Sequence, residues 1–248
     1  MAKTLYLTDL DGTLLRHDGN ISEFSPDIIN RFIAGGGLFS YATGRSFISS
    51  SAAVKRLNIN IPVICQTGAI IADLQTKKAL LLRTIAHEDA VSIFKTLLKL
   101  EVAPLVYSYA NGQEHIGHFG HESELCGQIS GFKWVDSMEN LAPIHKIFEN
   151  DKRIHVMFQK CTYAEGWWCE LLPPQATKAA AALEVKAMLG CDKIIAFGDG
   201  HNDISLFHAA DESYAMANAV PELKAIATAV IESNENDGVA KWFAKKYF

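Results

Sequence analysis

The chain has 248 residues, of which 49% are apolar and 21% are charged, a composition that excludes a disordered or collagen-like protein. Its 23 basic and 28 acidic side chains give a formal net charge of −5 at pH 7. A general nucleic-acid-binding protein carries a basic excess, so we expect no nucleic-acid partner. An anionic substrate would need a metal, local cations or helix N-termini to hold it.

The sequence shows no signal peptide and no membrane segment, which predicts a cytoplasmic protein. Charged residues interrupt the first nine positions, so no signal peptide is expected, and no run approaches the roughly 18 apolar residues of a membrane helix. The cysteines are odd in number and widely spaced, which favours reduced thiols that serve as small core residues. They are Cys65, Cys126, Cys161, Cys169 and Cys191.

The first seventy or so residues alternate short apolar runs with helical patterns. Strands are predicted at residues 4–8, 38–42 and 62–65. One helix is predicted to begin at Ser25, an N-cap before Pro26, and to stop at the glycines 35–37. Ser46 is expected to cap a second helix. This alternation indicates a parallel sheet with helices on its faces.

The pattern changes near residue 72 and returns after Pro173-Pro174. Between these points, the predicted strands are 80–82, 105–109, 114–118, 154–159 and 167–172. A helix at 87–100 and a hairpin signal at Asn111-Gly112 complete this segment, which favours helices on an antiparallel sheet.

The last part of the chain repeats the alternation of the first. Strands are predicted at 193–197, 213–216 and 228–231, and helices at 177–189, at 202–210, from Pro221 and after Gly238. We therefore expect an α/β fold in which residues 1–75 and 173–248 form a parallel-sheet core domain. A smaller α+β domain, residues 76–172, is inserted into it.

Two carboxylates, Asp9 and Asp11, directly follow the first predicted strand. Ligands bind at the carboxyl ends of strands in a parallel sheet. One carboxylate can be a nucleophile and the other a general acid/base, and both can hold a divalent cation. A plain Asp-Gly turn at Asp11-Gly12 is the alternative.

A second group, Thr43-Gly44-Arg45, follows the second predicted strand. The hydroxyl, the Gly44 amide and the guanidinium can contact phosphate oxygens, although a loop with a surface arginine fits as well. Lys178 lies in the first turn of a predicted helix, where a cation opposes the helix dipole unless an anion is near. A solvated surface lysine is the alternative reading.

The stretch 198–203 (Gly-Asp-Gly-His-Asn-Asp) follows another buried strand. Its glycines permit a tight turn, Asp199 can bind a metal, and Asn202 can cap a helix or contact a ligand. An Asx-rich turn with a helix cap is the alternative.

In this order, the motifs resemble those of the haloacid dehalogenase superfamily, and most of all its Cof-type phosphatases with the larger α/β cap of type C2. The motifs are Asp9–Thr13, Thr43-Gly44, Lys178 and Gly198–Asp203, with subgroup-like stretches at 216–219 and 236–240. The chain departs from many relatives at Gln66-Thr67-Gly68 and at Ala179. The resemblance covers about residues 1–72 and 173–248, and it implies a Rossmann-like core with an inserted cap.

The resemblance also implies the role of each site residue. Asp9 would be the nucleophile that forms an aspartyl-phosphate, and Asp11 the general acid and base. Mg²⁺ would be held by Asp9, by the main-chain carbonyl of Asp11 and by Asp199. The phosphoryl oxygens would be held by Thr43, Gly44, Lys178 and Asn202, with Asp203 and Arg45 in support.

The function that this implies is Mg²⁺-dependent hydrolysis of a small phosphorylated metabolite, with a sugar phosphate as the first expectation. A phosphomannomutase-like phosphotransferase is the alternative, because it shares the aspartyl-phosphate. A non-catalytic or receiver-type signalling module is a further alternative. The protein is expected to be a monomer or a homodimer.

Three evenly spaced histidines, His115, His118 and His121, lie in the insertion. Glycines between them disfavour a helix, and on a strand the first two would point to opposite faces. A solvated polar loop is therefore favoured over a substrate-contacting loop, and both over a zinc site. Further along the insertion, two consecutive tryptophans, Trp167 and Trp168, favour a core role for at least one indole.

Overall fold

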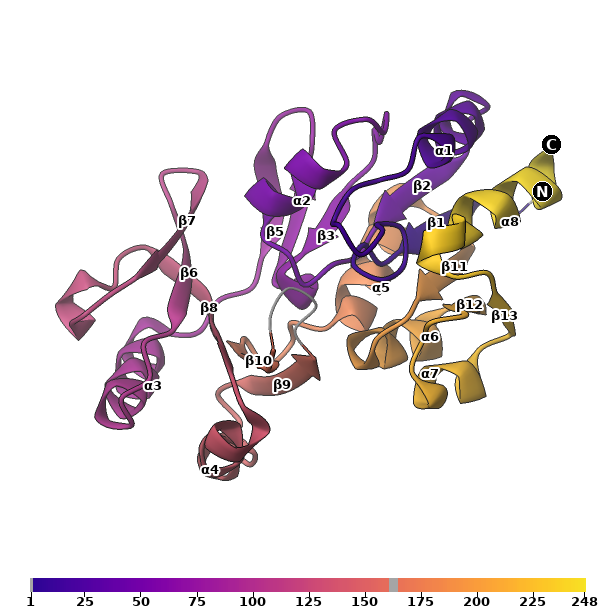
Figure 1. The fold of residues 1–248 in the computed structure, drawn as a ribbon. Helices are drawn as coiled ribbons and strands as arrows, with labels where there is room; N and C mark the ends of the chain where they lie inside the picture. The colour runs from indigo at the N-terminus through magenta and orange to yellow at the C-terminus, as the bar shows by residue number, and fades with distance from the viewer. Residues whose placement is uncertain (1, 161–164) are drawn as a thin grey trace. The chain divides into compact units, whose positions relative to one another are not determined.

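The computed structural model describes residues 2–160 and 165–248. The chain divides into two compact units, residues 1–80 with 177–248 (unit 1) and residues 81–176 (unit 2), as Figure 1 shows by colour. The domain limits expected from the sequence, 75/76 and 172/173, stay predictions. Cys161 lies outside the described residues.

The main sheet of unit 1 is parallel and follows the order β13-β12-β11-β1-β2. These strands are Ala229–Ile231, Glu212–Met216, Lys193–Gly198, Thr4–Thr8 and Leu38–Tyr41. Thr8 at the end of β1 pairs with Phe197 near the end of β11. Residues that follow β1 and β11 therefore emerge side by side at the carboxyl edge of the sheet.

A separate three-stranded sheet, β3-β4-β5, corrects one prediction. Its strands are Val63–Cys65, Ile70–Asp73 and Lys78–Leu82. The first was predicted to be a third strand of the parallel sheet, but β3 pairs antiparallel with β4, which was not predicted. A single parallel bridge, Ala42 to Ile64, joins β3 to the end of β2.

Six α-helices belong to the described part of unit 1. They are α1 (Phe24–Ala34), α2 (Phe47–Ala53), α5 (Lys178–Leu189), α6 (Ile204–Ala209), α7 (Pro221–Ile226) and α8 (Gly238–Tyr247). Helices α1 and α8 lie side by side (Figure 1). Phe32 of α1 and Phe243 of α8 form an aromatic cluster with Tyr6 of β1. Ser25 is not the N-cap of α1, because the helix begins one residue earlier and the Ser25 amide donates to Ser22 Oγ.

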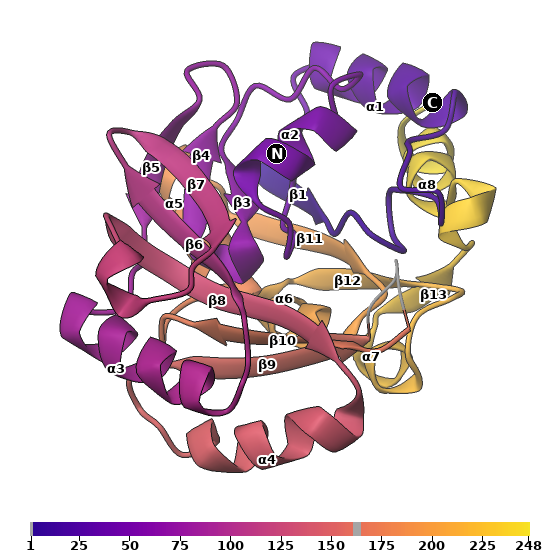
Figure 2. The ribbon, with the colours of Figure 1, turned by 60° about the vertical axis from the view of Figure 1, so that its left-hand side comes forward.

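Unit 2 is an antiparallel sheet, β7-β6-β8-β10-β9, with two helices on one face (Figure 2). The strands are Gln113–His118, Leu105–Ala110, Gln128–Asp136, Trp167–Leu172 and His155–Lys160, and the helices are α3 (His87–Lys99) and α4 (Met138–Phe148). The hairpin signal is confirmed, because Asn111 and Gly112 both have positive φ. Strand β8 and helix α4 were not predicted.

The two faces of this sheet differ in chemistry. Side chains such as Phe132, Cys169 and Leu171 join the core formed with α3 and α4. On the other face Lys133 pairs with the buried Glu170 at 2.8 Å and lies 4.4 Å from the Trp168 ring centre. Trp167 packs against the helical core, so the two neighbouring indoles serve opposite faces.

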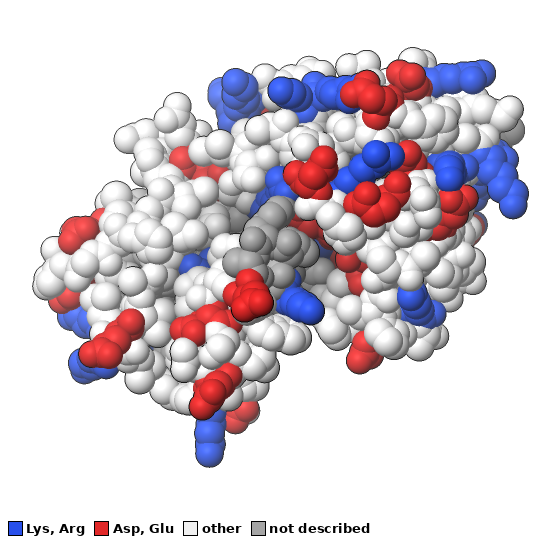
Figure 3. Space-filling view, viewed as in Figure 1, with Lys and Arg blue, Asp and Glu red and all other residues white. Residues whose placement is uncertain are grey.

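Short 3₁₀ turns complete the fold at Gln66–Gly68, Glu122–Glu124, His201–Asp203 and Asn234–Asn236. Cys65, Cys169 and Cys191 are buried as expected, but Cys126 is exposed and is not a core residue. Among the described residues, no helix is both long enough and apolar enough to span a bilayer. Basic and acidic side chains are interspersed over the face drawn in Figure 3.

Candidate active site

A buried lysine joins two aspartates of unit 1 that are far apart in the sequence. Lys178 is the first residue of α5, a helix that Thr177 caps by accepting the Ala180 amide. Its Nζ lies 2.6 Å from Asp9 Oδ1 and 2.6 Å from Asp203 Oδ1, and its side chain is fully buried. An ammonium group is stable in such a place only when it is paired, so the surface-lysine reading is wrong.

Asp203 serves this cluster as an orienting group. Its Oδ1 accepts from Lys178, and its Oδ2 accepts from the main-chain amides of Asp199 and Gly200, both at 3.0 Å. Both oxygens are thereby used within the protein. A Cβ atom on Gly198 would lie 2.6 Å from Asp203 Cγ, so only glycine at this position permits the close approach.

Asp199 is held from the opposite loop, the one that follows β1. Thr13 Oγ1 donates to Asp199 Oδ1 at 2.7 Å. Gly12 has φ of +76°, and a Cβ atom there would lie 2.3 Å from Asp199 Oδ2. The loop after β1 thus fits against the loop after β11 with no space for a side chain at Gly12.

The charges of the cluster do not cancel. Three carboxylates, those of Asp9, Asp199 and Asp203, surround one ammonium, and an oxygen from each lies within 4.8 Å of the others. Burial raises the pKa of Asp9 well above its usual range, and the Lys178 charge only partly opposes this. Burial and then the Asp203 charge raise the pKa of Asp199 to about 7.

The pKa of Lys178 is also raised. Burial alone would lower it, but the charges of Asp203 and Asp9 outweigh that effect. The lysine therefore stays protonated, and the cluster carries a net negative charge when its three carboxylates are ionised. A divalent cation would offset that charge and favour the ionised carboxylates.

Asp11 is paired with a different cation, Arg45. The Arg45 guanidinium donates two hydrogen bonds to the Asp11 carboxylate, Nε to Oδ2 at 2.7 Å and Nη2 to Oδ1 at 2.6 Å. The Asp11 side chain is 25% exposed, whereas that of Asp9 is 7% exposed. The two carboxylates of the motif therefore have different cationic partners.

Hydrogen bonds that involve the main chain order the second loop, Thr43-Gly44-Arg45. The Arg45 amide donates to Thr43 Oγ1 at 3.1 Å, and the Thr67 amide donates to the Thr43 carbonyl at 2.9 Å. Ser46 caps α2 as predicted, by accepting the Ser49 amide. The 3₁₀ turn at Gln66–Gly68 packs close to α5, because a Cβ on Gly68 would lie 2.3 Å from the Thr177 carbonyl oxygen.

Asn202 does not cap a helix. It lies inside the 3₁₀ turn His201–Asp203, which begins after Gly200. Within residues 2–160 and 165–248, no hydrogen bond links the side chains of Thr43 or Asn202 to the buried cluster of Asp9, Asp199, Asp203 and Lys178. Their roles as phosphate ligands, and that of Gly44, stay predictions.

A family profile described as haloacid dehalogenase-like hydrolase matches residues 6–123 and 129–243. The chain belongs to this hydrolase family. The predicted family and fold class are confirmed: an α/β core with a parallel sheet and an inserted segment with an antiparallel sheet.

Curated relatives of this hydrolase include two proteins of Bacillus subtilis. One, named 5-amino-6-(5-phospho-D-ribitylamino)uracil phosphatase YitU, is 27% identical, with 98% of this chain and 97% of the relative covered. The other has the same activity in its name, YwtE, and is 26% identical, with 94% of each covered.

Solved structures show the same fold. A haloacid dehalogenase-like hydrolase from Bacteroides thetaiotaomicron superposes with a TM-score of 0.83 at 19% identity, with all of both chains covered. A haloacid dehalogenase-like hydrolase from B. subtilis superposes with a TM-score of 0.80 at 21% identity, with 98% of this chain and 99% of that chain covered.

The acidic cluster of this hydrolase fits a divalent metal ion. Its donors are carboxylate oxygens, which hard divalent cations prefer, and its charge is net negative. Asp9 and Asp199 would be the carboxylate ligands. Asp203 belongs to the same cluster by distance, but its oxygens already accept three hydrogen bonds, which suits it to the supporting role.

Asn218, Asn234 and Thr13 support the site, although the sequence did not assign a role to any of them. Asn218 Nδ2 donates to the Gly12 carbonyl at 2.7 Å, and Asn218 Oδ1 accepts the Asn234 amide. The buried Asn234 side chain then donates to the Leu15 carbonyl at 2.9 Å. With Thr13, these asparagines hold the loop after β1. The Met-Ala-Asn-Ala pattern at 216–219 was the available signal.

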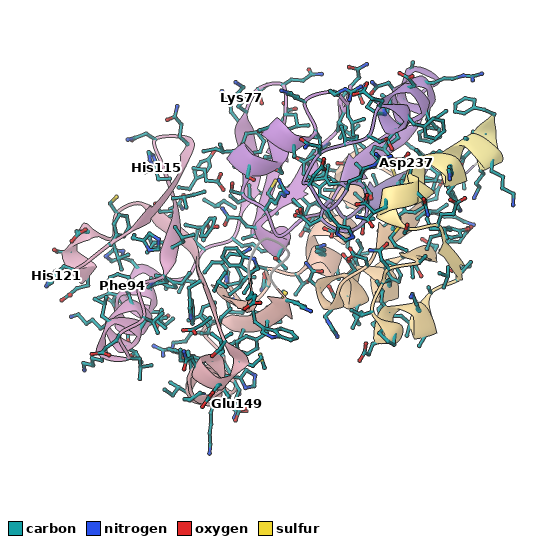
Figure 4. The ribbon with its side chains drawn as sticks, in the orientation of Figure 1. Lys77, Phe94, His115, His121, Glu149 and Asp237 are labelled. Carbon is teal, nitrogen blue, oxygen red and sulfur yellow. The ribbon has the colours of Figure 1, made fainter. Side chains whose placement is uncertain are left out.

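The histidines of unit 2 do not form a cluster. His115 lies on β7, and His121 caps the 3₁₀ turn at Glu122–Glu124, at separate places in Figure 4. His118 Nδ1 forms a hydrogen bond with the Ala103 carbonyl oxygen at 3.1 Å. In the described part of the chain, the only group of three or more potential metal ligands is the one formed by Asp9, Asp199 and Asp203.

Proposed function

We propose that this protein is a Mg²⁺-dependent phosphatase that hydrolyses a small phosphorylated metabolite through an aspartyl-phosphate on Asp9. The observation that carries the proposal is the buried Asp9–Lys178–Asp203 bridge beside Asp199, because it places an oriented carboxylate in a site with surplus negative charge. Phosphoryl transfer depends mainly on positioning and on neutralising charge, and this site supplies both once a cation is bound.

In the first half of the reaction, a carboxylate oxygen of Asp9 attacks phosphorus and the bond from phosphorus to the ester oxygen breaks. Asp11 gives its proton to the departing oxygen, so the leaving group departs as an alcohol. Lys178 holds the Asp9 carboxylate in one orientation through the 2.6 Å bond. Mg²⁺, when bound by Asp9, Asp199 and the Asp11 carbonyl, would offset the charge of the phosphoryl oxygens.

In the second half, Asp11 takes a proton from water and the water oxygen attacks phosphorus. The bond between phosphorus and Asp9 breaks, which releases inorganic phosphate and restores the carboxylate. Thr43, the Gly44 amide, Lys178 and Asn202 are the proposed contacts of the phosphoryl oxygens. Buried Lys178 can reach them without leaving Asp9, because an ammonium has three donors.

The substrate class rests on the relatives. Two of them are named as phosphatases of a ribityl phosphate attached to an aminouracil. We therefore propose sugar phosphates and related polyol phosphates as the first substrates to test. The family match favours a hydrolase over a receiver-type or non-catalytic module.

Phosphate release from a panel of phosphorylated metabolites and aryl phosphates, with Mg²⁺ or with EDTA, tests the proposal. We expect turnover only with Mg²⁺, and a loss of at least about a thousandfold in Asp9→Asn, since the nucleophile is removed. Asp27→Asn is the matched control, because this exposed carboxylate in α1 lies outside the site.

Two results would contradict the proposal. Equal phosphate release by the wild type and Asp9→Asn would exclude Asp9 as nucleophile. Interconversion of sugar phosphate isomers without release of phosphate would instead support the phosphomannomutase-like alternative.

A further inference from the structure

The ion pair between Arg45 and Asp11 has a geometry that goes beyond neutralising a charge. One guanidinium occupies both oxygens of the carboxylate, at 2.7 and 2.6 Å. Such a fork fixes the plane of the carboxylate as well as its position. We propose that Arg45 is a positioning residue that acts on the reaction through Asp11, by holding this carboxylate in the orientation that serves the leaving group. The inference rests on the proposed function.

The main chain around Arg45 is well anchored. Its amide donates to Thr43 Oγ1 at 3.1 Å, and its carbonyl accepts the Gln66 amide at 2.8 Å. The next residue, Ser46, caps α2. The guanidinium therefore extends from a fixed point, and its side chain is only 16% exposed.

The main chain on the Asp11 side of the fork is also ordered. The Leu10 carbonyl accepts the amides of Thr13, Leu14 and Leu15, so the loop after β1 is tightly wound. Both partners of the fork therefore extend from ordered main chain, and its two bonds select one plane for the Asp11 carboxylate.

The same geometry revises the role expected for Arg45. The sequence suggested that its guanidinium contacts the phosphoryl group. In the structure, two of its three nitrogens are bonded to Asp11. A phosphate contact and a positioning role predict different kinetics, because the first concerns every substrate equally and the second concerns the leaving group.

The leaving group provides the readout. Phenyl phosphate releases a phenol with a pKa of about 10 and needs its proton, whereas 4-nitrophenyl phosphate releases a far more acidic phenol and needs it much less. The parameter to compare is kcat/KM, because it reports the steps up to departure of the leaving group and excludes hydrolysis of the aspartyl-phosphate.

We expect Arg45→Ala to lower kcat/KM for phenyl phosphate by about 10- to 100-fold, and for 4-nitrophenyl phosphate by less than about threefold. Arg45→Lys should show the same imbalance in weaker form, because an ammonium keeps the charge but cannot form the fork. In an Asp11→Asn background, Arg45→Ala should add no further imbalance, since the two residues act as one unit.

Arg56→Ala is the matched control, because Arg56 makes a similar two-bond fork to Glu23, with both bonds at 2.8 Å, elsewhere in unit 1. It should leave the ratio of the two kcat/KM values unchanged. Thermal unfolding of each variant shows whether it is folded at the assay temperature. A smaller fraction of folded protein would lower kcat/KM for phenyl phosphate and for 4-nitrophenyl phosphate by the same factor, whereas a misoriented Asp11 would change their ratio.

The inference is overturned if Arg45→Ala lowers kcat/KM for both esters equally, which is the result expected of a phosphate contact, or if Arg56→Ala produces the same imbalance. It is also overturned if Arg45→Ala adds a further imbalance in the Asp11→Asn background. Failure of the proposed function is a distinct result: Asp9→Asn would then equal the wild type on both esters.

Discussion

The pKa of the half-buried Asp199 carboxylate predicts how the stability of the metal-free protein depends on pH. Its pKa rises from an ordinary 3.8 to about 7 in the folded state, first through burial and then through the Asp203 charge. The folded protein therefore binds this proton more tightly than the unfolded chain. The stability supplied by the protonated form is fully present below about pH 4 and is lost as the pH rises to about 7.

The magnitude follows from the size of the pKa change. A rise from 3.8 to about 7, at 1.36 kcal/mol for each pKa unit, corresponds to roughly 4 kcal/mol. Asp199→Asn removes the titrating group and keeps the shape of the side chain. We expect the free energy of unfolding of the variant, relative to the wild type, to increase by up to about 4 kcal/mol between pH 4 and pH 8 in EDTA.

Urea unfolding of both proteins at a series of pH values in EDTA measures this difference, and Asp27→Asn controls for the simple loss of a negative charge. The difference between variant and wild type cancels the contributions of groups that titrate elsewhere. Added Mg²⁺ should stabilise the wild type more at pH 8 than at pH 5, and should stabilise Asp199→Asn much less. A difference that is flat from pH 4 to pH 8, or that falls as the pH rises, would refute the reasoning.

Three further predictions concern the residues around Asp199. Gly12→Ala places a Cβ 2.3 Å from Asp199 Oδ2, so we expect Mg²⁺ affinity by calorimetry to fall at least about tenfold; unchanged affinity would contradict the close fit. Lys178→Met leaves the carboxylates it bridged buried without their cation, and urea unfolding at pH 7 should show a loss of about 3–5 kcal/mol. A loss below 1 kcal/mol would show that the bridge is weak. Asn218→Ala frees the Gly12 carbonyl and should cost about 1–2 kcal/mol with a fall in kcat, whereas a purely structural role would leave kcat unchanged in the folded protein.

Much of the fold could be predicted from the sequence because its signals are local. The strands that flank the site, β1 and β11, are short apolar runs with a polar residue directly after them. The cap of α2 by Ser46 follows from one side chain and one turn. Signals of this kind do not depend on distant contacts.

Other elements were missed because tertiary contacts decide them. Helix α4 contains Pro143, which disfavours a helix interior, and its burial of Leu141 and Ile144 against the sheet compensates. Strand β8 contains Gly131, and its pairing with β6 shifts register near Tyr107. Both features weaken the regular pattern of a strand or helix in the sequence.

The site shows the same division. The motifs identified Asp9, Lys178 and Asp203 as members of one site, but the bridge between them spans 169 and 25 residues and has no local signal. The fork between Arg45 and Asp11 spans 34 residues and likewise has no local signal in the sequence. The residue types and their positions at strand ends could be predicted from the sequence, whereas the ion pairs that these residues form could not.

The position of β1 in the main sheet has a consequence for how the chain is made. β1 lies between β2, which follows soon in the sequence, and β11, which begins only at Lys193. While the ribosome has made only the first 176 residues, one edge of β1 has no neighbour, and Lys178 does not yet exist to pair with Asp9. All of unit 2 precedes β11 in the chain, so its residues are made before the main sheet of the core can be completed. The nascent core then carries an open strand edge until β11 emerges, and this interval is when a chaperone or a self-association event would act on the chain.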